Sequence, residues 1–215
     1  MNDFISANAV ALLILAFSVL WLIVSACWSW WVESPPLDQT ISLSPPGTPE
    51  TAVTVRIGDQ YWLWLNFERG GLSLDALREK TGGMTTGPDG KTVENAGTPV
   101  TVRWQMTAKG GGEPVFAGEV RSTGAASAAD ATIGRLLGRA EVRSGRYSFT
   151  AEIVGDTPEF AGAQTRLTLV LDEAKGHSWA LKLGWLLSLL GSFAIKPVAV
   201  VAAAVVAWNA ARLFM

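Results

Sequence analysis

The residue types that most often carry enzyme chemistry are scarce in this chain. It contains one histidine, His177, and one cysteine, Cys27, and both lie at or within apolar segments. A hydrolytic triad or a zinc site normally needs more of these residues. The carboxylates Asp75, Glu79 and Asp89 are scattered singly, so they indicate neither a calcium loop nor a glycosidase pair. We therefore predict no enzymatic activity, no metal and no cofactor.

Two tryptophans, Trp62 and Trp64, are the strongest candidates for recognition chemistry. They alternate with the apolar residues of the run 61–67, so in a strand they point to the opposite face from the core side chains. Aromatic anchors supply much of the affinity at protein interfaces, which makes this pair a candidate partner-binding patch. The alternative is a strand buried on both faces, with a short helix at 74–80 packed over the tryptophans.

Arginines form a second candidate patch. Arg135, Arg139 and Arg143 follow one another at intervals of four residues, a spacing that would suit a stripe for an acidic protein partner. The alternative is a set of solvated arginines around a hairpin. Basic residues number 17 against 19 acidic ones and show no dense cluster, so we expect no nucleic-acid partner.

Cys27 would allow a third kind of chemistry, covalent lipidation. The segment Val24-Ser25-Ala26-Cys27 resembles the lipobox of bacterial lipoproteins, in which the cysteine becomes lipidated after cleavage. Residues 1–6, however, contain no Lys or Arg, whereas export signals normally begin with positive charge. The competing interpretation is an uncleaved helix, in which Cys27 is one small apolar residue among many.

The N-terminal segment indicates how such a recognition surface would be held at a membrane. Residues 9–32 contain no charged residue and exceed the roughly 20 residues needed to cross a bilayer. Trp28, Trp30 and Trp31 at its end suit the membrane interface. We expect residues 1–33 to form a transmembrane helix or a signal anchor.

The C-terminal segment 175–215 is also apolar. From residue 179 onward its only charged residues are Lys182, Lys196 and Arg212. A charge and a helix breaker meet at Lys196-Pro197. We therefore expect an interfacial helix followed by one transmembrane helix that starts near Pro197; a hairpin of two short spans and a single long kinked helix are the alternatives.

The middle of the chain changes to the period of β-strands. Residues 34–50 contain five prolines and are expected to form a linker, and residues 51–174 are expected to form a β-domain. Alternating apolar residues predict about seven antiparallel strands with one face on a core. The runs are 53–57, 61–68, 100–107, 147–153 and 167–171, with weaker runs at 115–120 and 136–142.

One local motif narrows the fold class to an all-β sandwich of the immunoglobulin-like or jelly-roll type, flanked by transmembrane α-helices. Gly145 and Tyr147 resemble a tyrosine corner, in which a glycine turn precedes a strand and the tyrosine hydroxyl bonds to upstream backbone. Phe149 stands where antibody domains have a cysteine, which excludes a disulfide-bonded domain of that kind.

The three stretches Tyr61-Trp-Leu-Trp-Leu-Asn-Phe, Pro99-Val-Thr-Val-Arg-Trp and Ser144-Gly-Arg-Tyr-Ser-Phe carry a family resemblance. Over residues 50–172 the chain resembles an uncharacterised family of bacterial periplasmic lipoprotein-like β-domains. Members often accompany type VI secretion effector genes, and the resemblance implies a periplasmic immunity role. The C-terminal membrane segment departs from the simple lipoprotein pattern.

These observations lead to two functional hypotheses. In the first, the chain is a bacterial inner-membrane protein with its β-domain in the periplasm, and it acts as an immunity protein that blocks a secreted toxin by direct binding. In the second, it is a structural or assembly subunit of an envelope membrane complex. Both require the membrane and a protein partner.

Overall fold

The computed structural model describes residues 2–86, 92–128, 132–172 and 178–212. The chain divides into two compact units, one formed by Met1–Ser34 with His177–Met215 and the other by Pro35–Gly176. The first unit is helical, whereas the second is built mainly from strands.

The helical unit consists of two long apolar runs. Helix α1 spans Asn2–Glu33, and the second run joins α3 (Trp179–Leu190), the π-helical turn η2 (Gly191–Ile195) and α4 (Lys196–Ala211). Both runs are long and apolar enough to cross a membrane by length and composition. Only 6% and 11% of their most apolar windows are buried in the structure, far less than in the core helix of a soluble protein.

The second helical run differs from the expected interfacial helix and separate span. The chain stays helical through Lys196-Pro197, so residues 179–211 form one continuous helical run. The π turn η2 ends directly before Lys196, which places Pro197 in the first turn of α4. Inside a helix a proline removes one backbone hydrogen bond and its ring crowds the preceding turn, and the wider π turn, in which the Lys196 N–H bonds to the Gly191 carbonyl, accommodates it.

Polar and aromatic contacts hold α1 beside the second helical run. The Asn209 Nδ2 donates to the Asn8 Oδ1 at 2.8 Å, and the Trp28 Nε1 donates to the Ala180 carbonyl at 3.2 Å. Gly184 lets the Trp28 ring approach, because a Cβ at this glycine would lie 3.3 Å from the Trp28 Nε1. Backbones approach closely where small residues face a neighbouring helix, which is typical of helix pairs in membranes.

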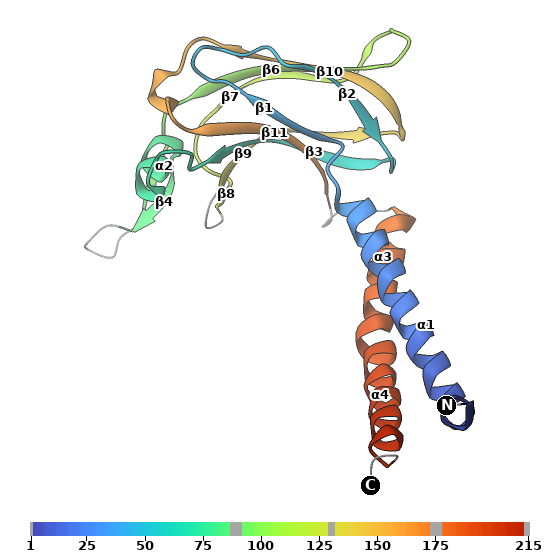
Figure 1. Ribbon diagram of the computed structural model, residues 1–215. Coiled ribbons are helices and arrows are strands. Elements are labelled where there is room, and N and C mark those ends of the chain that lie inside the picture. The colour runs from blue at the N-terminus through green and yellow to red at the C-terminus, as the bar shows by residue number, and fades with distance from the viewer. Residues whose placement is uncertain (1, 87–91, 129–131, 173–177, 213–215) are drawn as a thin grey trace. The chain divides into compact units, whose positions relative to one another are not determined.

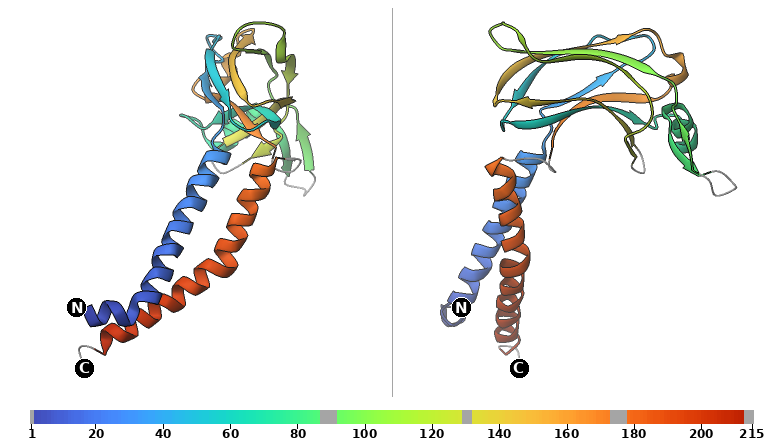
Figure 2. Two further views of the ribbon diagram at one scale, coloured as in Figure 1. Left: turned by 90° about the vertical axis from the view of Figure 1, so that its right-hand side faces the viewer. Right: turned by 180° about the vertical axis from the view of Figure 1, so that it is seen from behind.

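Two antiparallel sheets lie as facing layers in the second unit (Figures 1 and 2). The five-stranded sheet has the order β1 (Leu37–Ile41), β11 (Gln164–Leu171), β3 (Asp59–Glu68), β9 (Thr132–Val142) and β8 (Ser127–Ala128). The four-stranded sheet has the order β2 (Glu50–Val55), β10 (Gly145–Val154), β6 (Val100–Ala108) and β7 (Pro114–Ser122). The remaining elements are α2 (Leu74–Thr81), the hairpin β4 (Gly83–Thr86) and β5 (Thr92–Asn95), and the short helix η1 (Pro158–Phe160).

One hydrophobic core fills the space between the two sheets. Leu63, Leu65 and Phe67 of β3 are fully buried and belong to the same cluster as Val102 of β6 and Phe149 of β10. Burying one such side chain stabilises the fold by roughly 1.5–3 kcal/mol. A shared core between two antiparallel sheets is the arrangement of a β-sandwich.

All seven predicted runs overlap observed strands, but β1 was not predicted. It lies inside the segment 34–50 that was expected to be a linker, and it pairs with β11 in the register Leu37↔Leu169 to Ile41↔Thr165. Leu37 and Ile41 are buried, so this edge strand adds to the core. The prolines of the segment lie outside β1, where they take no donor from the sheet.

The predicted short helix is confirmed as α2. Ser73 caps it, with its hydroxyl accepting a hydrogen bond from the Ala76 N–H at 3.1 Å. Leu77 is fully buried in the core cluster, and α2 lies at one end of the two sheets (Figure 1).

Each of the two tyrosines anchors the start of a strand to the backbone before it. The Tyr147 hydroxyl donates to the Arg143 carbonyl at 2.7 Å, which is the hydrogen bond of a tyrosine corner. Gly145 makes room for it, because a Cβ there would lie 3.3 Å from the Tyr147 hydroxyl. The Tyr61 hydroxyl makes an equivalent bond of 2.7 Å to the Ile57 carbonyl, again four residues upstream.

The prediction of an exposed arginine stripe is wrong at Arg135. Its side chain is fully buried, because residue 135 of β9 points into the sandwich beside Leu65. Its guanidinium donates to the Thr98 carbonyl at 2.8 Å and the Ser122 carbonyl at 3.0 Å. It also donates to the Thr81 carbonyl at the end of α2.

Among the described residues, carbonyls and aromatic rings, not carboxylates, surround the buried cation of Arg135. Its guanidinium carbon lies 5.2 Å from the Phe67 ring centroid and 5.8 Å from that of Phe160, within the range of cation–π attraction. The carbonyls it contacts at Thr81 lie at the negative C-terminal end of α2. Burial lowers the pKa of Arg135 to about 10, so the group stays charged at neutral pH.

We expect Arg135→Met to reduce the free energy of unfolding by about 2–4 kcal/mol, because it leaves buried carbonyls without donors. Arg135→Lys should lose nearly as much, since an ammonium has three donors and no planar fork. Urea titration of the full chain in detergent micelles, followed by tryptophan fluorescence, measures the loss. The exposed Arg139→Met is the matched control on the same strand, and an equal effect of the two Met variants would contradict the anchoring role.

Tyr61 gives the domain a specific weakness at high pH. Burial, and next the Asp59 carboxylate, raise the pKa of Tyr61 from 10.0 to about 12. The folded state therefore holds this proton more tightly than the unfolded state, and the stabilisation is complete below pH 10 and lost as the pH rises towards 12. We expect a loss of about 2–3 kcal/mol over that range. The difference in alkaline absorbance titration between wild type and Tyr61→Phe isolates this tyrosine; a Tyr61 that ionises near pH 10 in the folded chain would refute the prediction.

Candidate functional site

The candidate site is the outer face of the five-stranded sheet, at its centre. Trp62 and Trp64 lie on this face of β3, alternating with the buried Tyr61, Leu63 and Leu65. Both tryptophans are half-buried, and the buried Leu77 of α2 belongs to the core cluster between the sheets. Figure 1 shows the sheet curved so that this outer face is concave.

The two tryptophans form one aromatic surface. Their ring centroids lie 5.7 Å apart and the planes are tilted by 43°. Leu136 of β9 pairs with Trp64 and is half-buried on the same face. Gly134 comes next along β9, and a Cβ there would lie 3.2 Å from the Trp64 ring. The glycine is buried, with the Ser127 hydroxyl and the Asn66 side-chain oxygen also within 3.0 Å of that Cβ position, so it lets these groups and the Trp64 ring pack closely against β9.

A β-bulge decides which residues of β9 reach this face. The register shifts between Leu63↔Gly138 and Trp64↔Leu136, so β9 carries one extra residue, Leu137, which is buried. The extra residue changes the phase of the alternation. As a result Arg135 points into the core, whereas Arg139 pairs with Trp62 and is exposed.

Arg139 and Asp172 fix Trp62 from two sides. The Arg139 guanidinium carbon lies 4.5 Å from the Trp62 ring centroid, close enough for a cation–π interaction of about 0.5–1 kcal/mol at an exposed site. The Trp62 Nε1 donates to the Oδ2 of the buried Asp172 at 2.8 Å. Asp172 follows β11 and is tied to β3 by its own N–H, which donates to the Gln60 carbonyl at 2.9 Å.

The other end of the face is polar. The Asn66 Nδ2 donates to the Thr168 Oγ1 at 2.7 Å across β3 and β11. Arg166 makes ion pairs of 3.3 Å with Asp38 and 3.8 Å with Glu68. The face thus combines a central aromatic patch with polar side chains that already have partners.

The predicted arginine stripe is not formed. Arg135 is in the core and Arg139 is on the aromatic face, while Arg143 is exposed in the turn after β9 and offers its carbonyl to Tyr147. Sequence reasoning missed Asp172, because it lies 110 residues from Trp62 and only the pairing of β3 with β11 brings them together.

This arrangement suits non-covalent recognition. Half-buried rings can bind a partner by losing their contact with water. The exposed guanidinium can bind by charge, and the fixed amide and hydroxyl groups by hydrogen bonds. Within the residues that the structure describes, no group of three or more His, Cys, Asp or Glu residues could hold a metal ion. His177 lies outside the described residues.

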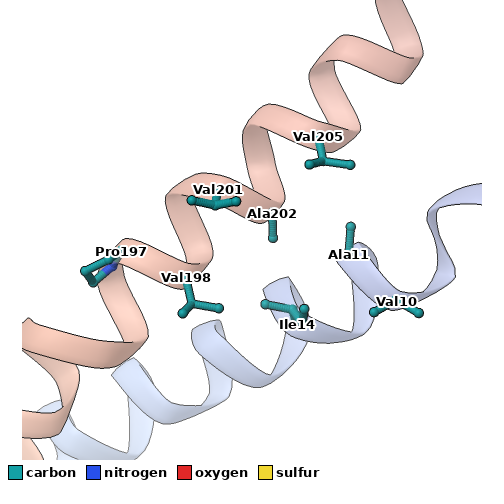
Figure 3. A pocket seen from close by; sticks show the side chains of 8 residues that line it. All are labelled: Val10, Ala11, Ile14, Pro197, Val198, Val201, Ala202 and Val205. Atoms are coloured by element: carbon teal, nitrogen blue, oxygen red, sulfur yellow. The ribbon is translucent and has the colours of Figure 1, made fainter.

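Two hollows are lined by described residues of the helical unit. The first, of about 480 Å³, is lined by apolar side chains and lies between α1 and α4 (Figure 3). The second, of about 140 Å³, contains several serines and Lys196. Cys27 is exposed on α1, within the last two turns of the helix.

Comparisons with known proteins leave the family open. No family profile matches the chain, and no curated protein does. Among solved structures, the chain is similar to GEBA250068378 from Sulfurospirillum deleyianum, with a TM-score of 0.50 and 21% identity over 63% of this chain and 96% of that one. A second structure, TmCBM61 in complex with β-1,4-galactotriose, has a TM-score of 0.26 and 11% identity over 63% of this chain and 69% of that one. The first of these likenesses shows a shared fold over the matched part of the chain and nothing about function.

Proposed function

We propose that this chain is a membrane-anchored binding protein whose partner contacts the aromatic face around Trp62, Trp64 and Arg139. The observation that supports it best is the fixed geometry of Trp62, held by Asp172 on one side and by Arg139 on the other. A side chain that is already ordered loses little entropy on binding, so it is an effective anchor. The partner would offer an apolar pocket for the rings and a carboxylate for Arg139.

The anchoring part of the proposal rests on the two helical runs. Each is apolar, long enough to span a bilayer and almost free of buried surface. Because α1 precedes the β-unit and α3 follows it, two spans place the β-unit on one side of the membrane and both outer helix ends on the other. We propose that this membrane is a bacterial inner membrane and that the β-unit lies on its periplasmic side.

We propose an immunoglobulin-like sandwich for the β-unit, in place of a jelly roll. The tyrosine corner formed by Tyr147 and Arg143 supports this type. It gives a rigid platform whose outer sheet faces are free for partners.

The partner that we propose is a secreted toxin, which makes the protein an immunity protein acting by occlusion. Occlusion needs a complementary surface and no chemistry, in keeping with a face of aromatic and polar groups. The resemblance of residues 50–172 to periplasmic domains near type VI secretion effector genes points to the same class of partner. A subunit role in an envelope complex is the second candidate, and the mixed hollow around Lys196 favours it.

We expect Trp62→Ala and Trp64→Ala each to reduce recovery of the partner at least about tenfold, and Arg139→Ala to have a smaller effect, because it removes a charge at the edge of the face. The measurement is quantitative pull-down of the tagged full-length protein from its own membranes. Arg103→Ala is the matched control, because Arg103 is an exposed arginine paired with Glu119 and Glu152 on the other sheet. Equal losses for Arg103→Ala and Trp62→Ala would rule out the aromatic face.

We expect protease added to spheroplasts to digest the β-unit while tags ahead of α1 and after α4 stay protected. An intact N-terminus, seen by mass spectrometry, is the expected companion result. A mature chain that begins at a lipidated Cys27 would establish the lipoprotein interpretation, and a protected β-unit would reverse the proposed orientation.

A further inference from the structure

Lys196 lies at the midpoint of the second helical run. It follows Trp179 by 17 residues (196 − 179) and precedes Ala211 by 15 (211 − 196). At 1.5 Å per residue these are about 25 Å and about 22 Å. In a hydrocarbon layer of about 30 Å, a lysine at the middle is too deep for its side chain to reach either headgroup region.

Neither helical run carries an acidic residue in its interior that could neutralise this charge. The sequence contains no Asp or Glu between Phe4 and Val32, and none between Ser178 and Arg212. Accordingly, the described residues include no ion-pair partner for Lys196. A charged side chain inside a membrane is costly unless it is paired, and such residues almost always face a protein neighbour.

The surroundings of Lys196 are rich in hydroxyl groups, which can both donate and accept hydrogen bonds. It lines the hollow of about 140 Å³ together with Ser25 and Ser29 of α1 and with Ser188 and Ser192 of the second run. The Oγ of Ser25 is buried and makes no hydrogen bond in the structure.

A second unpaired donor lies beside the same hollow. The Nε1 of Trp21 is buried without a partner, and it lies next to Gly191, where a Cβ would be 3.6 Å away. Gly191 also lines the hollow and opens the π turn η2, a distortion that recurs at functional sites in helices. An ammonium, an indole N–H and a hydroxyl thus lie in one region, and an acceptor with negative charge is the group that would satisfy them together.

We propose that the transmembrane helix of another membrane protein packs beside this hollow and inserts an Asp or Glu carboxylate into it, against Lys196, Ser25 and Trp21. A second copy of this chain cannot supply the group, because its own spans lack acidic residues. A lipid phosphate is excluded by depth. This inference rests on the membrane insertion proposed above and adds a partner inside the bilayer to the one at the aromatic face.

The test uses the full-length protein in phosphatidylcholine vesicles, with a donor dye after α4. The probes are three synthetic polyleucine transmembrane helices that carry a central Glu, Gln or Leu and an acceptor dye. Energy transfer as a function of peptide density gives the association constant. We expect the Glu helix to associate about tenfold more tightly than the Leu helix, the range expected for a strong polar contact between helices.

Variants of the protein separate the specific contact from general helix packing. Lys196→Met should remove the preference for the Glu helix, whereas Lys182→Met, a lysine near the start of the same run, should keep it. Lys196→Glu should instead prefer a polyleucine helix with a central Lys. Retention of the Glu preference in Lys196→Met would overturn the proposal, and so would strong energy transfer between two labelled copies of the wild type.

Carbonate extraction of the same vesicles distinguishes a failure of the membrane-anchoring proposal from a failure of the inference about Lys196. Protein that carbonate releases is not inserted, and this result would overturn both the anchoring proposal and the inference. Protein that stays inserted but binds the three peptides equally would overturn the inference alone.

Discussion

The buried guanidinium of Arg135 is the interaction on which the β-unit depends. It projects from β9 into the sandwich and bonds the end of α2 at Thr81, the approach to β6 at Thr98 and the end of β7 at Ser122. One side chain of the five-stranded sheet thus bonds α2 and two segments of the four-stranded sheet. Since the group is charged and buried, every lost bond leaves either a cation or a carbonyl unsatisfied, which makes this end of the sandwich cooperative.

The bulge in β9 places the two arginines of this strand on opposite faces of the sheet. With simple alternation, Arg135 and Arg139 would lie on the same face of the sheet. One of them could then not be buried in the core while the other is exposed beside Trp62. The extra residue at Leu137 changes the phase, so that Arg135 anchors the core and Arg139 covers Trp62. Trp62 and Arg139 therefore lie on strands whose other face is held in the core, which is what a pre-organised binding surface requires.

The elements that depend on local sequence patterns were predicted, whereas the features that depend on pairing between distant segments were not. The strands around Trp62, Val102 and Phe149, the helix capped by Ser73 and the turn before Tyr147 follow from alternation, capping and turn chemistry. Strand β1 could not be predicted, because Leu37–Ile41 becomes a strand only through pairing with β11. The burial of Arg135 was not predicted for a similar reason, because no local sequence pattern marks the β-bulge. Pro197 suggested a helix end, but the π turn before it lets the helix continue.

The central claim, that the aromatic face is the partner-binding surface, is tested most directly by site-specific photo-crosslinking in living cells. A photoreactive amino acid at Leu136 lies beside Trp64 on that face, and one at Arg103 lies on the outer face of the other sheet. The account predicts a single prominent protein adduct from position 136 and none from position 103. Adducts from position 103 alone, or equal adducts from both positions, would contradict it.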